Sequence, residues 1–266
     1  MSPSRCKPRQ ICGSAGIDTW REFTGTQSLH DLISDRASEL IQGTSDIALL
    51  EAGCGMASYF EFPNVVRSAG IDISKEQLDA NTMVQERILG DIQTYPLPKE
   101  AFDVVVCWNV IEHLPRPQDA LRNLFNAVKM NGLLILGFPN ILSFKGIATK
   151  ITPFWFHEIF YRMMKYESRH FPTYLRLAIL PGRVITFAQE GGFTVAFGTL
   201  VEGGVTKRFR NRFRFVDFVF AAATVTAHVV SLGKCPSLYL DNCALILKKV
   251  NRTGAVFRGG TETISN

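Results

Sequence analysis

Short runs of apolar residues alternate with helix-like patterns between residues 47 and 140. The runs read IALLEAG, SAGIDIS, RILGDI, FDVVVCWNV and GLLILGFPN, and the helical patterns KEQLDANTMV and PQDALRNLFNAVK lie between them. Apolar residues fill these runs continuously, which is typical of parallel strands buried on both faces. The alternation therefore predicts an α/β fold, with a doubly wound, mostly parallel sheet that helices cover on both faces.

Patterns on either side of this stretch extend the predicted sheet and its cover. Residues 18–42 place apolar side chains every three to four positions and predict an amphipathic helix. The segment RVITFAQEGG predicts a helix that ends at a glycine pair. FTVAFGTLVEGG and LYLDNCALILKKV are strand candidates, so we expect a Rossmann-like sheet of seven strands.

We expect these elements to form a single domain over residues 1–266. Residues 1–16 are predicted to be a loose leader and residues 47–140 the ligand-binding core. Residues 141–182 are rich in aromatic residues and broken by prolines, which predicts an insertion that covers the site as a lid. Residues 205–236 form a second insertion, of basic and apolar residues.

Composition places the chain among folded proteins. With 46% hydrophobic and 20% charged residues, it does not belong to the disordered or low-complexity class, and a net charge of +5 is too small to indicate nucleic-acid binding. The six cysteines show no spacing typical of metal sites or disulfides, and Cys54 and Cys107 are expected to pack as small core residues. The first residues lack the apolar segment of a secretory signal, so we expect a cytoplasmic protein.

The strongest signal of a ligand site is LLEAGCGMA at residues 49–57, where a strand runs into a glycine turn. Glycines at the end of a parallel strand let the backbone approach a ligand, and doubly wound sheets bind ligands at that edge. A dinucleotide fingerprint would need a third glycine, where this chain has Ser58, and a long helix, which Phe62-Pro63 interrupts. The loop therefore disfavours NAD and FAD.

Two carboxylates follow at the ends of the next predicted strands. Asp72 comes about twenty positions after the glycines, where a carboxylate accepts hydrogen bonds from ribose hydroxyls. Asp91 follows Gly90 and suits an adenine amino group; either carboxylate could instead cap a helix or a turn. Without a phosphate cradle, the set predicts a site for a nucleoside that carries no phosphate.

Four successive motifs resemble the class I S-adenosylmethionine-dependent methyltransferases. They are Glu51-Ala-Gly53-Cys-Gly55, Gly70-Ile-Asp72-Ile, Gly90-Asp91 and FDVVVCWNVIEHL at residues 102–114, and with GLLIL from Gly132 they cover about a third of the chain. The form WNVIEHLPRPQDAL is most similar to the branch that methylates small molecules such as quinones, polyketides and lipids. The resemblance implies S-adenosyl-L-methionine as the cofactor, bound by residues 47–140.

The resemblance also implies which residues hold the methionine end of the cofactor. Glu51, Gly53 and Gly55 would hold the amino group and backbone of the methionine moiety, and Asn109 would line it. The chain departs from the family at Phe62-Pro63-Asn64, which shorten the helix that usually follows the glycine loop. The shortened helix affects how the carboxylate end of the cofactor would be covered.

For the nucleoside end, the resemblance implies two pairs of residues. Asp72 would bind the ribose while Ile73 packs on the adenine. Asp91 and Ile92 would lie at the edge of the adenine.

Methyl transfer from a sulfonium requires alignment, a dry pocket and, for a hydroxyl or amine acceptor, a base. Histidine is the natural base near neutral pH, and His157 and His170 are the candidates because they lie in the predicted lid. Either could equally be a structural histidine, and a carboxylate acceptor would need no base. Glu112-His113 is interpreted as a family marker, and no acidic cluster indicates a metal.

The aromatic lid predicts a hydrophobic small molecule as the methyl acceptor, with a hydroxyl or carboxylate oxygen as the target. These rings could also simply pack the lid onto the sheet. The motif of many amino-group and nucleic-acid methyltransferases would follow the fourth strand, where this chain reads Cys107-Trp108-Asn109-Val110, so nucleic acid is not expected as a partner. The alternative hypotheses are a non-catalytic protein that binds the cofactor, and a nucleotide-dependent oxidoreductase.

The insertion at residues 205–236 joins a basic stretch to an apolar one. Five basic residues and no acidic residue lie between Lys207 and Arg214, so the rest of the chain has no net charge. The next eighteen residues contain one charge, Asp217, but also several polar side chains that make a membrane-spanning helix unfavourable. Burial against the sheet or a second copy is one interpretation, and peripheral membrane contact through residues 207–232 is another. The oligomeric state cannot be predicted from the sequence.

Overall fold

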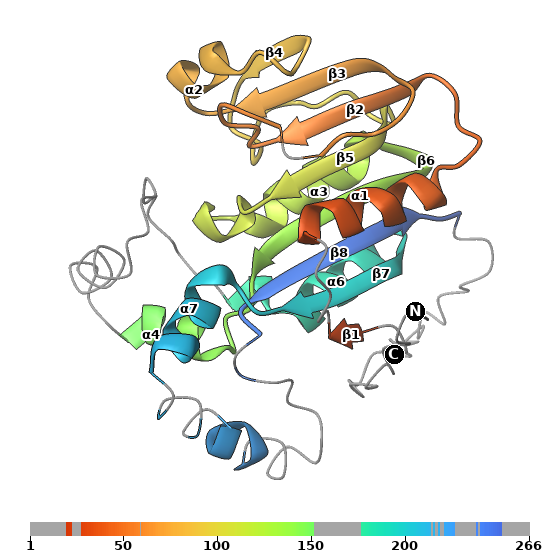
Figure 1. The fold of residues 1–266 in the computed structure, drawn as a ribbon. Helices are drawn as coiled ribbons and strands as arrows, with labels where there is room; N and C mark the ends of the chain where they lie inside the picture. The colour runs from red at the N-terminus through yellow and green to blue at the C-terminus, as the bar shows by residue number, and fades with distance from the viewer. Residues whose placement is uncertain are drawn as a thin grey trace, which may run out of the picture.

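The computed structural model describes residues 20–22, 28–58, 60–151, 177–213, 215, 218, 221–226, 238 and 240–251. Within these residues the chain forms one sheet, in the order β1-β7-β8-β6-β5-β2-β3-β4 (Figure 1). The strands are β1 (Trp20–Glu22), β2 (Ile47–Ala52), β3 (Val65–Asp72), β4 (Glu86–Leu89), β5 (Phe102–Trp108), β6 (Val128–Pro139), β7 (Phe193–Val201) and β8 (Asn242–Lys249). β8 runs antiparallel to both of its neighbours, β6 and β7, and the other described pairs are parallel.

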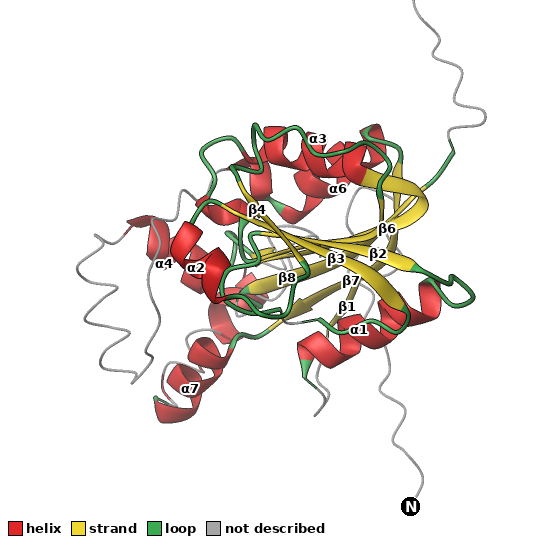
Figure 2. Ribbon diagram, turned by 90° about the horizontal axis from the view of Figure 1, so that it is seen from above, coloured by secondary structure: helices red, strands yellow, loops and turns green. Residues whose placement is uncertain are grey.

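The sheet confirms the predicted doubly wound, Rossmann-like fold. The seven predicted strands are β2 to β8, and β1 extends the edge of the sheet by pairing with β7. The described helices are α1 (Leu29–Leu40), α2 (Lys75–Ala80), α3 (Pro117–Ala127), α4 (Phe144–Ile151), α6 (Pro181–Glu190) and α7 (Gly204–Arg212), with 3₁₀ turns η1 (Ile111–His113) and η2 (Leu177–Ile179). α3 and α6 cover one face of the sheet and α1 covers the other (Figure 2).

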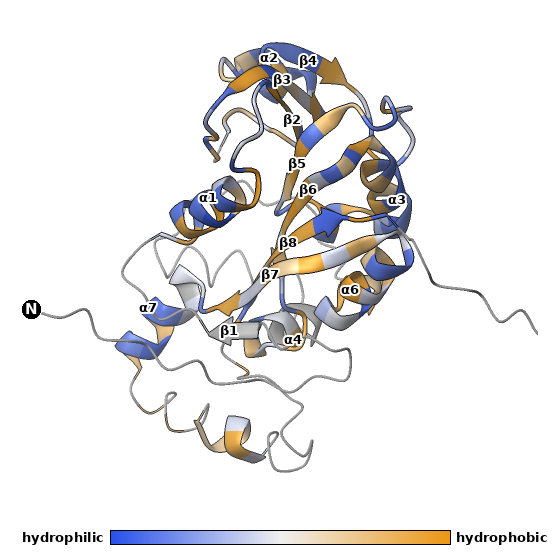
Figure 3. Cartoon of the chain, turned by 90° about the vertical axis from the view of Figure 1, so that its right-hand side faces the viewer, coloured by the Kyte–Doolittle hydropathy of each residue, from blue (hydrophilic) through white to orange (hydrophobic). Residues whose placement is uncertain are grey.

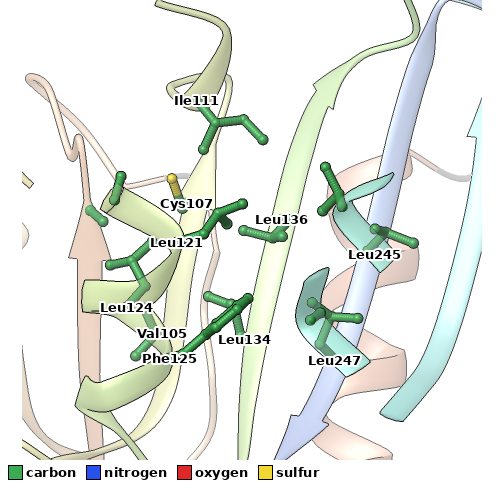
Figure 4. Packing of buried hydrophobic residues seen from close by; sticks show 14 of the residues in the cluster. Val105, Cys107, Ile111, Leu121, Leu124, Phe125, Leu134, Leu136, Leu245 and Leu247 are labelled. Carbon is green, nitrogen blue, oxygen red and sulfur yellow. The ribbon is translucent and has the colours of Figure 1, made fainter. Parts of the chain in front are cut away.

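The two faces of the central strands build two separate hydrophobic clusters. Successive side chains of a strand point to opposite faces, so Leu50 and Val105 pack beneath α3 and α6, whereas Leu49 and Val104 pack beneath α1. Figure 4 shows the first cluster, in which Leu124 of α3 lies against the side chains of β5 and β6. This double burial explains why the strands read as continuous apolar runs.

The first predicted helix is shorter than the pattern over residues 18–42 indicated. α1 begins only at Leu29, because the side chain of Ser28 accepts a hydrogen bond from the backbone N–H of Asp31 (3.2 Å) and caps the helix. Residues 20–22 pair with β7 as a strand. Two other predicted helices also end early: α2 stops at Ala80, and α3 gives way at Val128 to β6, which pairs with β5.

Several predicted segments lie outside the described residues. These are the leader at residues 1–16, residues 152–176 of the lid, and residues 214, 216–217, 219–220 and 227–236 of the second insertion. Cys54 and Cys107 are buried in the core as predicted. Among the residues that the structure describes, no helix is long and apolar enough to cross a membrane.

Candidate functional site

A cleft of about 370 Å³ opens at the carboxyl ends of β2, β3, β4 and β5. It is lined by Gly53, Gly55, Asp72, Ile73, Ser74, Gln77, Gly90, Asp91, Ile92, Gln93, Asn109, Val110, His113, Leu114 and Pro115. Seven of the eight residues predicted to hold the cofactor are in this set, and Glu51 is not. The topology thus brings segments from four strand ends into one site.

The glycine loop after β2 presents its backbone to the cleft. Gly53 and Gly55 both adopt left-handed backbone conformations, with φ of +72° and +54°, which glycine reaches without steric cost. A Cβ atom on Gly53 would overlap the side chain of Val110. The backbone N–H of Gly55 donates to Oδ2 of Asp72 (2.9 Å). The loop therefore requires glycine at position 53 for close packing as well as for its conformation.

The side chain of Asn81 holds the glycine loop in place, a role that the sequence patterns did not predict. Its side chain is fully buried, and Nδ2 donates to the carbonyl of Gly55 (3.2 Å) while Oδ1 accepts from the backbone N–H of Met83 (2.9 Å). Asn81 lies three positions after the buried Leu78 of α2. The sequence did contain an indication of this role, because Asn81 is polar at a position where the helical pattern predicts a buried apolar residue.

Asp72 lies at the end of β3 and joins two segments of the cleft. Besides accepting from Gly55, its carboxylate accepts through Oδ1 from the backbone N–H of Ser74 (2.8 Å). The next side chain, Ile73, is 76% exposed and lines the cleft. An exposed apolar side chain beside a carboxylate is the arrangement expected where a base stacks next to a ribose.

Asp91 is held by a residue that the sequence analysis did not single out. Gln93 donates to the Asp91 carboxylate from both its backbone N–H (2.8 Å) and its side-chain Nε2 (2.9 Å to each oxygen). The side-chain oxygen of Gln93 in turn accepts from the backbone N–H of Arg116 (2.8 Å). Ile92 is buried and also lines the cleft. Gln93 thus connects the β4 end of the cleft to the start of α3.

Asn109 closes the cleft at the end of β5. It adopts a left-handed backbone, with φ of +55°, and its N–H donates to the carbonyl of Gly137 on β6 (2.8 Å). Asparagine tolerates this conformation better than most residues do. The turn directs Asn109, Val110 and His113 toward the cleft.

Glu51 lies behind the glycine loop, beside a small cavity of about 20 Å³. Phe60 and Trp108 also line this cavity, and their rings pack edge to face with centroids 4.9 Å apart. Burial raises the pKa of the Glu51 carboxyl, and a hydrogen bond with Ser58 opposes this rise. Gly53 lines both this small cavity and the main cleft. Glu51 therefore lies next to the expected methionine end of the cofactor without lining the main cleft.

The predicted bases His157 and His170 lie outside the described residues. His113 is the histidine that lines the cleft within the described part of the chain, and its Nε2 lies 3.9 Å from Oε1 of Glu112. Burial raises the pKa of Glu112 to about 8, although a backbone hydrogen bond and nearby Lys145 favour the ionised form. Its other oxygen, Oε2, has no hydrogen-bond partner among the described residues.

The described cysteines do not supply a nucleophile. Burial, with the nearby carboxylates of Asp72 and Glu51, raises the pKa of the Cys54 thiol to about 12. Burial also raises the pKa of Cys107 and Cys243. A thiol reacts as the thiolate, so these three side chains are inert near neutral pH. The structure shows no group of three metal-ligating side chains among the residues it describes.

The charged residues that line the cleft favour one class of nucleoside compound over another. Its lining contains two aspartates and neither lysine nor arginine. A dinucleotide would bring a negatively charged diphosphate, which this lining would repel. S-adenosyl-L-methionine carries a positively charged sulfonium and an uncharged nucleoside, and both suit the same lining.

Comparison with known proteins agrees with this geometry. Residues 50–136 match the family model described as a methyltransferase domain. This stretch contains all the residues that line the cleft, so the match supports a methyltransferase domain around it. The match supports the resemblance deduced from the four motifs, and S-adenosyl-L-methionine is the cofactor of S-adenosylmethionine-dependent methyltransferases.

Individual curated proteins are similar to this chain over about half of their length. The chain is 27% identical over 136 residues to a probable S-adenosylmethionine-dependent methyltransferase of Mycolicibacterium smegmatis, covering 49% of this chain and 52% of that protein. It is 28% identical over 137 residues to the mitochondrial ubiquinone biosynthesis O-methyltransferase of Schizosaccharomyces pombe, covering 44% and 50%. The chain thus spans about half the length of the curated relatives it matches.

A solved structure shares the fold over a longer stretch. The [4+2]-cyclase SpnF superposes with a TM-score of 0.50 at 17% identity, over 87% of this chain and 86% of that one. Identity this low shows a common fold and leaves the reaction open, since one fold carries different chemistries.

Proposed function

We propose that this chain is a methyltransferase that moves the methyl group of S-adenosyl-L-methionine to an oxygen of a hydrophobic small molecule. The observation that carries the proposal is the single cleft in which Gly53, Gly55, Asp72, Asp91 and Asn109 meet. These residues come from three separate strand ends and the glycine turn of a fourth, and together they match a nucleoside without phosphate. When bound, the cofactor supplies a methyl group that a nucleophile can take up by displacement at carbon.

The protein's own contribution is binding, orientation and exclusion of water. The glycine loop offers backbone groups, and Asp72 offers carboxylate lone pairs beyond those used by Gly55 and Ser74. Val110 and Leu114 give the cleft an apolar wall. Such positioning in a dry site is the main source of acceleration when the reacting group is already activated.

The acceptor is proposed to be hydrophobic and to react at oxygen. Exposed apolar side chains Leu142 and Ile147 lie at the start of the predicted lid, just beyond β6. Two curated relatives named as ubiquinone biosynthesis O-methyltransferases, from Schizosaccharomyces pombe and Vibrio atlanticus, support an oxygen target on an apolar molecule. A hydroxyl acceptor would need a base, and His113 joins His157 and His170 as candidates because it lines the cleft.

Calorimetric titration with S-adenosylhomocysteine tests the cofactor site. Asp72→Ala should weaken binding by about 100-fold, because it removes the ribose acceptor and the partner of the Gly55 N–H. Asp79→Ala is the matched control, since Asp79 is exposed on α2 and pairs only with the exposed Lys75 in the described contacts. Equal affinity of the two variants, or absence of binding by the folded wild type, would refute the assigned site.

Mass spectrometry tests the reaction. The protein and cofactor are incubated with a hydrophobic phenol, a long-chain carboxylic acid and a primary amine, and products are examined for an added methyl group. Methylation of the phenol or acid supports the proposal. Tight cofactor binding without methyl transfer to any compound in a cell extract would favour the non-catalytic alternative instead, and methylation of the amine alone would contradict an oxygen target.

A further inference from the structure

We propose that α7 and the residues after it form a surface that docks on an anionic lipid bilayer. This docking face consists of Lys207, Arg208, Arg212, Phe215 and Phe218. It is independent of the proposed reaction, because none of these side chains lines the cofactor cleft.

The cations of the docking face project away from the protein. Lys207, Arg208 and Arg212 are exposed, whereas Thr206 of the same helix is buried and Arg210 is bound to Glu202 (2.9 Å). One face of α7 is therefore packed and the opposite face is basic. In Figure 3, α7 stands beside the sheet as a hydrophilic helix.

A buried carboxylate fixes this orientation. Asp241, which is 1% exposed just before β8, accepts from the hydroxyl of Thr206 (2.7 Å) and from the backbone N–H of Gly203. The Nζ atom of Lys145 on α4 lies 3.7 Å from the same carboxylate. Because Asp241 ties the first turn of α7 to the sheet, the basic face keeps one direction relative to the rest of the molecule.

Large aromatic side chains continue the docking face. Phe215 is 78% exposed and Phe218 is 72% exposed. Phe213 is partly exposed as well, with the guanidinium of Arg212 5.9 Å from its ring centre. Basic residues beside exposed phenylalanines are the composition of segments that lie in a membrane interface, where the cations meet lipid phosphates and the rings enter the acyl boundary.

Charge decides between a bilayer and other occupants. Two copies meeting through this face would oppose cations to cations, which is unfavourable. A nucleic acid would neutralise the cations, but it would not require a pair of neighbouring exposed phenylalanines. An anionic bilayer would bind both the cations and the phenylalanines of the docking face. Each basic residue near such a surface strengthens binding by about fivefold.

The position of the face also suits a membrane-bound acceptor. Asp241 precedes β8, which pairs with the carboxyl end of β6, so α7 lies on the edge of the sheet where the cofactor cleft opens (Figure 1). Docking would hold that edge close to the lipid.

Co-sedimentation of the full chain with vesicles tests the proposal. We expect binding to vesicles of phosphatidylcholine mixed with phosphatidylglycerol and little binding to phosphatidylcholine alone, with affinity falling as salt rises. The variant Lys207→Gln, Arg208→Gln, Arg212→Gln should bind the mixed vesicles about 100-fold more weakly. The variant Phe215→Ser, Phe218→Ser should bind them at least about tenfold more weakly.

The matched control is Arg36→Gln, Lys99→Gln, Arg183→Gln, which removes the same charge from a half-buried position on α1 and from exposed positions on a loop and α6. Circular dichroism and S-adenosylhomocysteine titration verify that each variant is folded. The proposal is overturned if the wild type binds neutral and mixed vesicles equally or not at all, or if the control loses as much affinity as the α7 variant. It is also overturned if light scattering shows a dimer that the phenylalanine variant dissociates, or if the wild type binds single-stranded RNA more tightly than vesicles.

Discussion

The two halves of the sheet's carboxyl edge are built on different principles. On the β2–β5 side, the cleft is made of turns whose backbone groups are tied to one another through Asp72, Asn81 and Gln93. On the β6–β8 side, one buried carboxylate, Asp241, contacts both Lys145 of α4 and Thr206 of α7, while the outer face of α7 is basic and exposed. The first half therefore uses its polar contacts to shape a cleft, whereas the second uses them to anchor helices and leaves basic side chains exposed.

Gly53→Ala should have the largest effect, on both stability and cofactor binding. The left-handed backbone and the overlap with Val110 together should cost about 4 kcal/mol of unfolding free energy. Binding of S-adenosylhomocysteine should fall below detection. Gly43→Ala is the control, because Gly43 also has a positive φ but has open space around it. Urea denaturation and titration measure both variants, and similar losses in the two would show that packing against Val110 is unimportant.

Glu112, at the boundary between the two halves, should make stability fall as pH rises. The unfolded carboxyl titrates near 4.5 and the folded one near 8, so the stabilisation is complete below pH 4.5 and is lost as pH rises through about 8. Between pH 5 and pH 8 the wild type should lose about 3 kcal/mol that Glu112→Gln does not lose.

Denaturant titrations at several pH values measure this difference. Glu86→Gln is the control, because a hydrogen bond with Arg67 lowers the pKa of Glu86, which therefore stays ionised over the same range. Parallel pH profiles for the wild type and Glu112→Gln would contradict the assigned protonated carboxyl.

Asp241→Ala should affect the second half alone. It leaves the Thr206 hydroxyl and the Gly203 N–H without their acceptor and should reduce the unfolding free energy by about 2–3 kcal/mol. Affinity for S-adenosylhomocysteine should change less than twofold, because Asp241 does not line the cleft. A large loss of cofactor affinity would mean that the two halves are coupled.

Thr206→Val should have the smallest effect. It removes one hydrogen bond to Asp241 while keeping the shape of the side chain, and should cost about 1 kcal/mol. Thermal unfolding measures the loss, which should be absent when the substitution is made in the Asp241→Ala background. An undiminished loss in that background would show that Thr206 acts through packing instead.

The sequence predicted much of the β2–β5 side of the sheet, where the cleft lies. Continuous apolar runs identified the strands, and the short-range spacing of glycines and carboxylates identified Gly53, Gly55, Asp72 and Asp91, because each lies at the end of its own strand. Asn81 and Gln93 were not recognised, since their partners become neighbours only when turns fold over them. Glu51, predicted to hold the methionine moiety, lines the small cavity next to the main cleft, and its role there stays a prediction.

What the sequence determined by itself is therefore local. The periodicity of apolar residues determined the strand and helix types, and a strand followed by a glycine turn determined where a ligand could approach. The tertiary structure decided which distant groups share a space. It placed Asp241 beneath α7 across 35 residues and left Glu112 buried near Lys145 of α4. Burial and long-range contact depend on how the sheet closes against its helices, and spacing along the chain does not encode them.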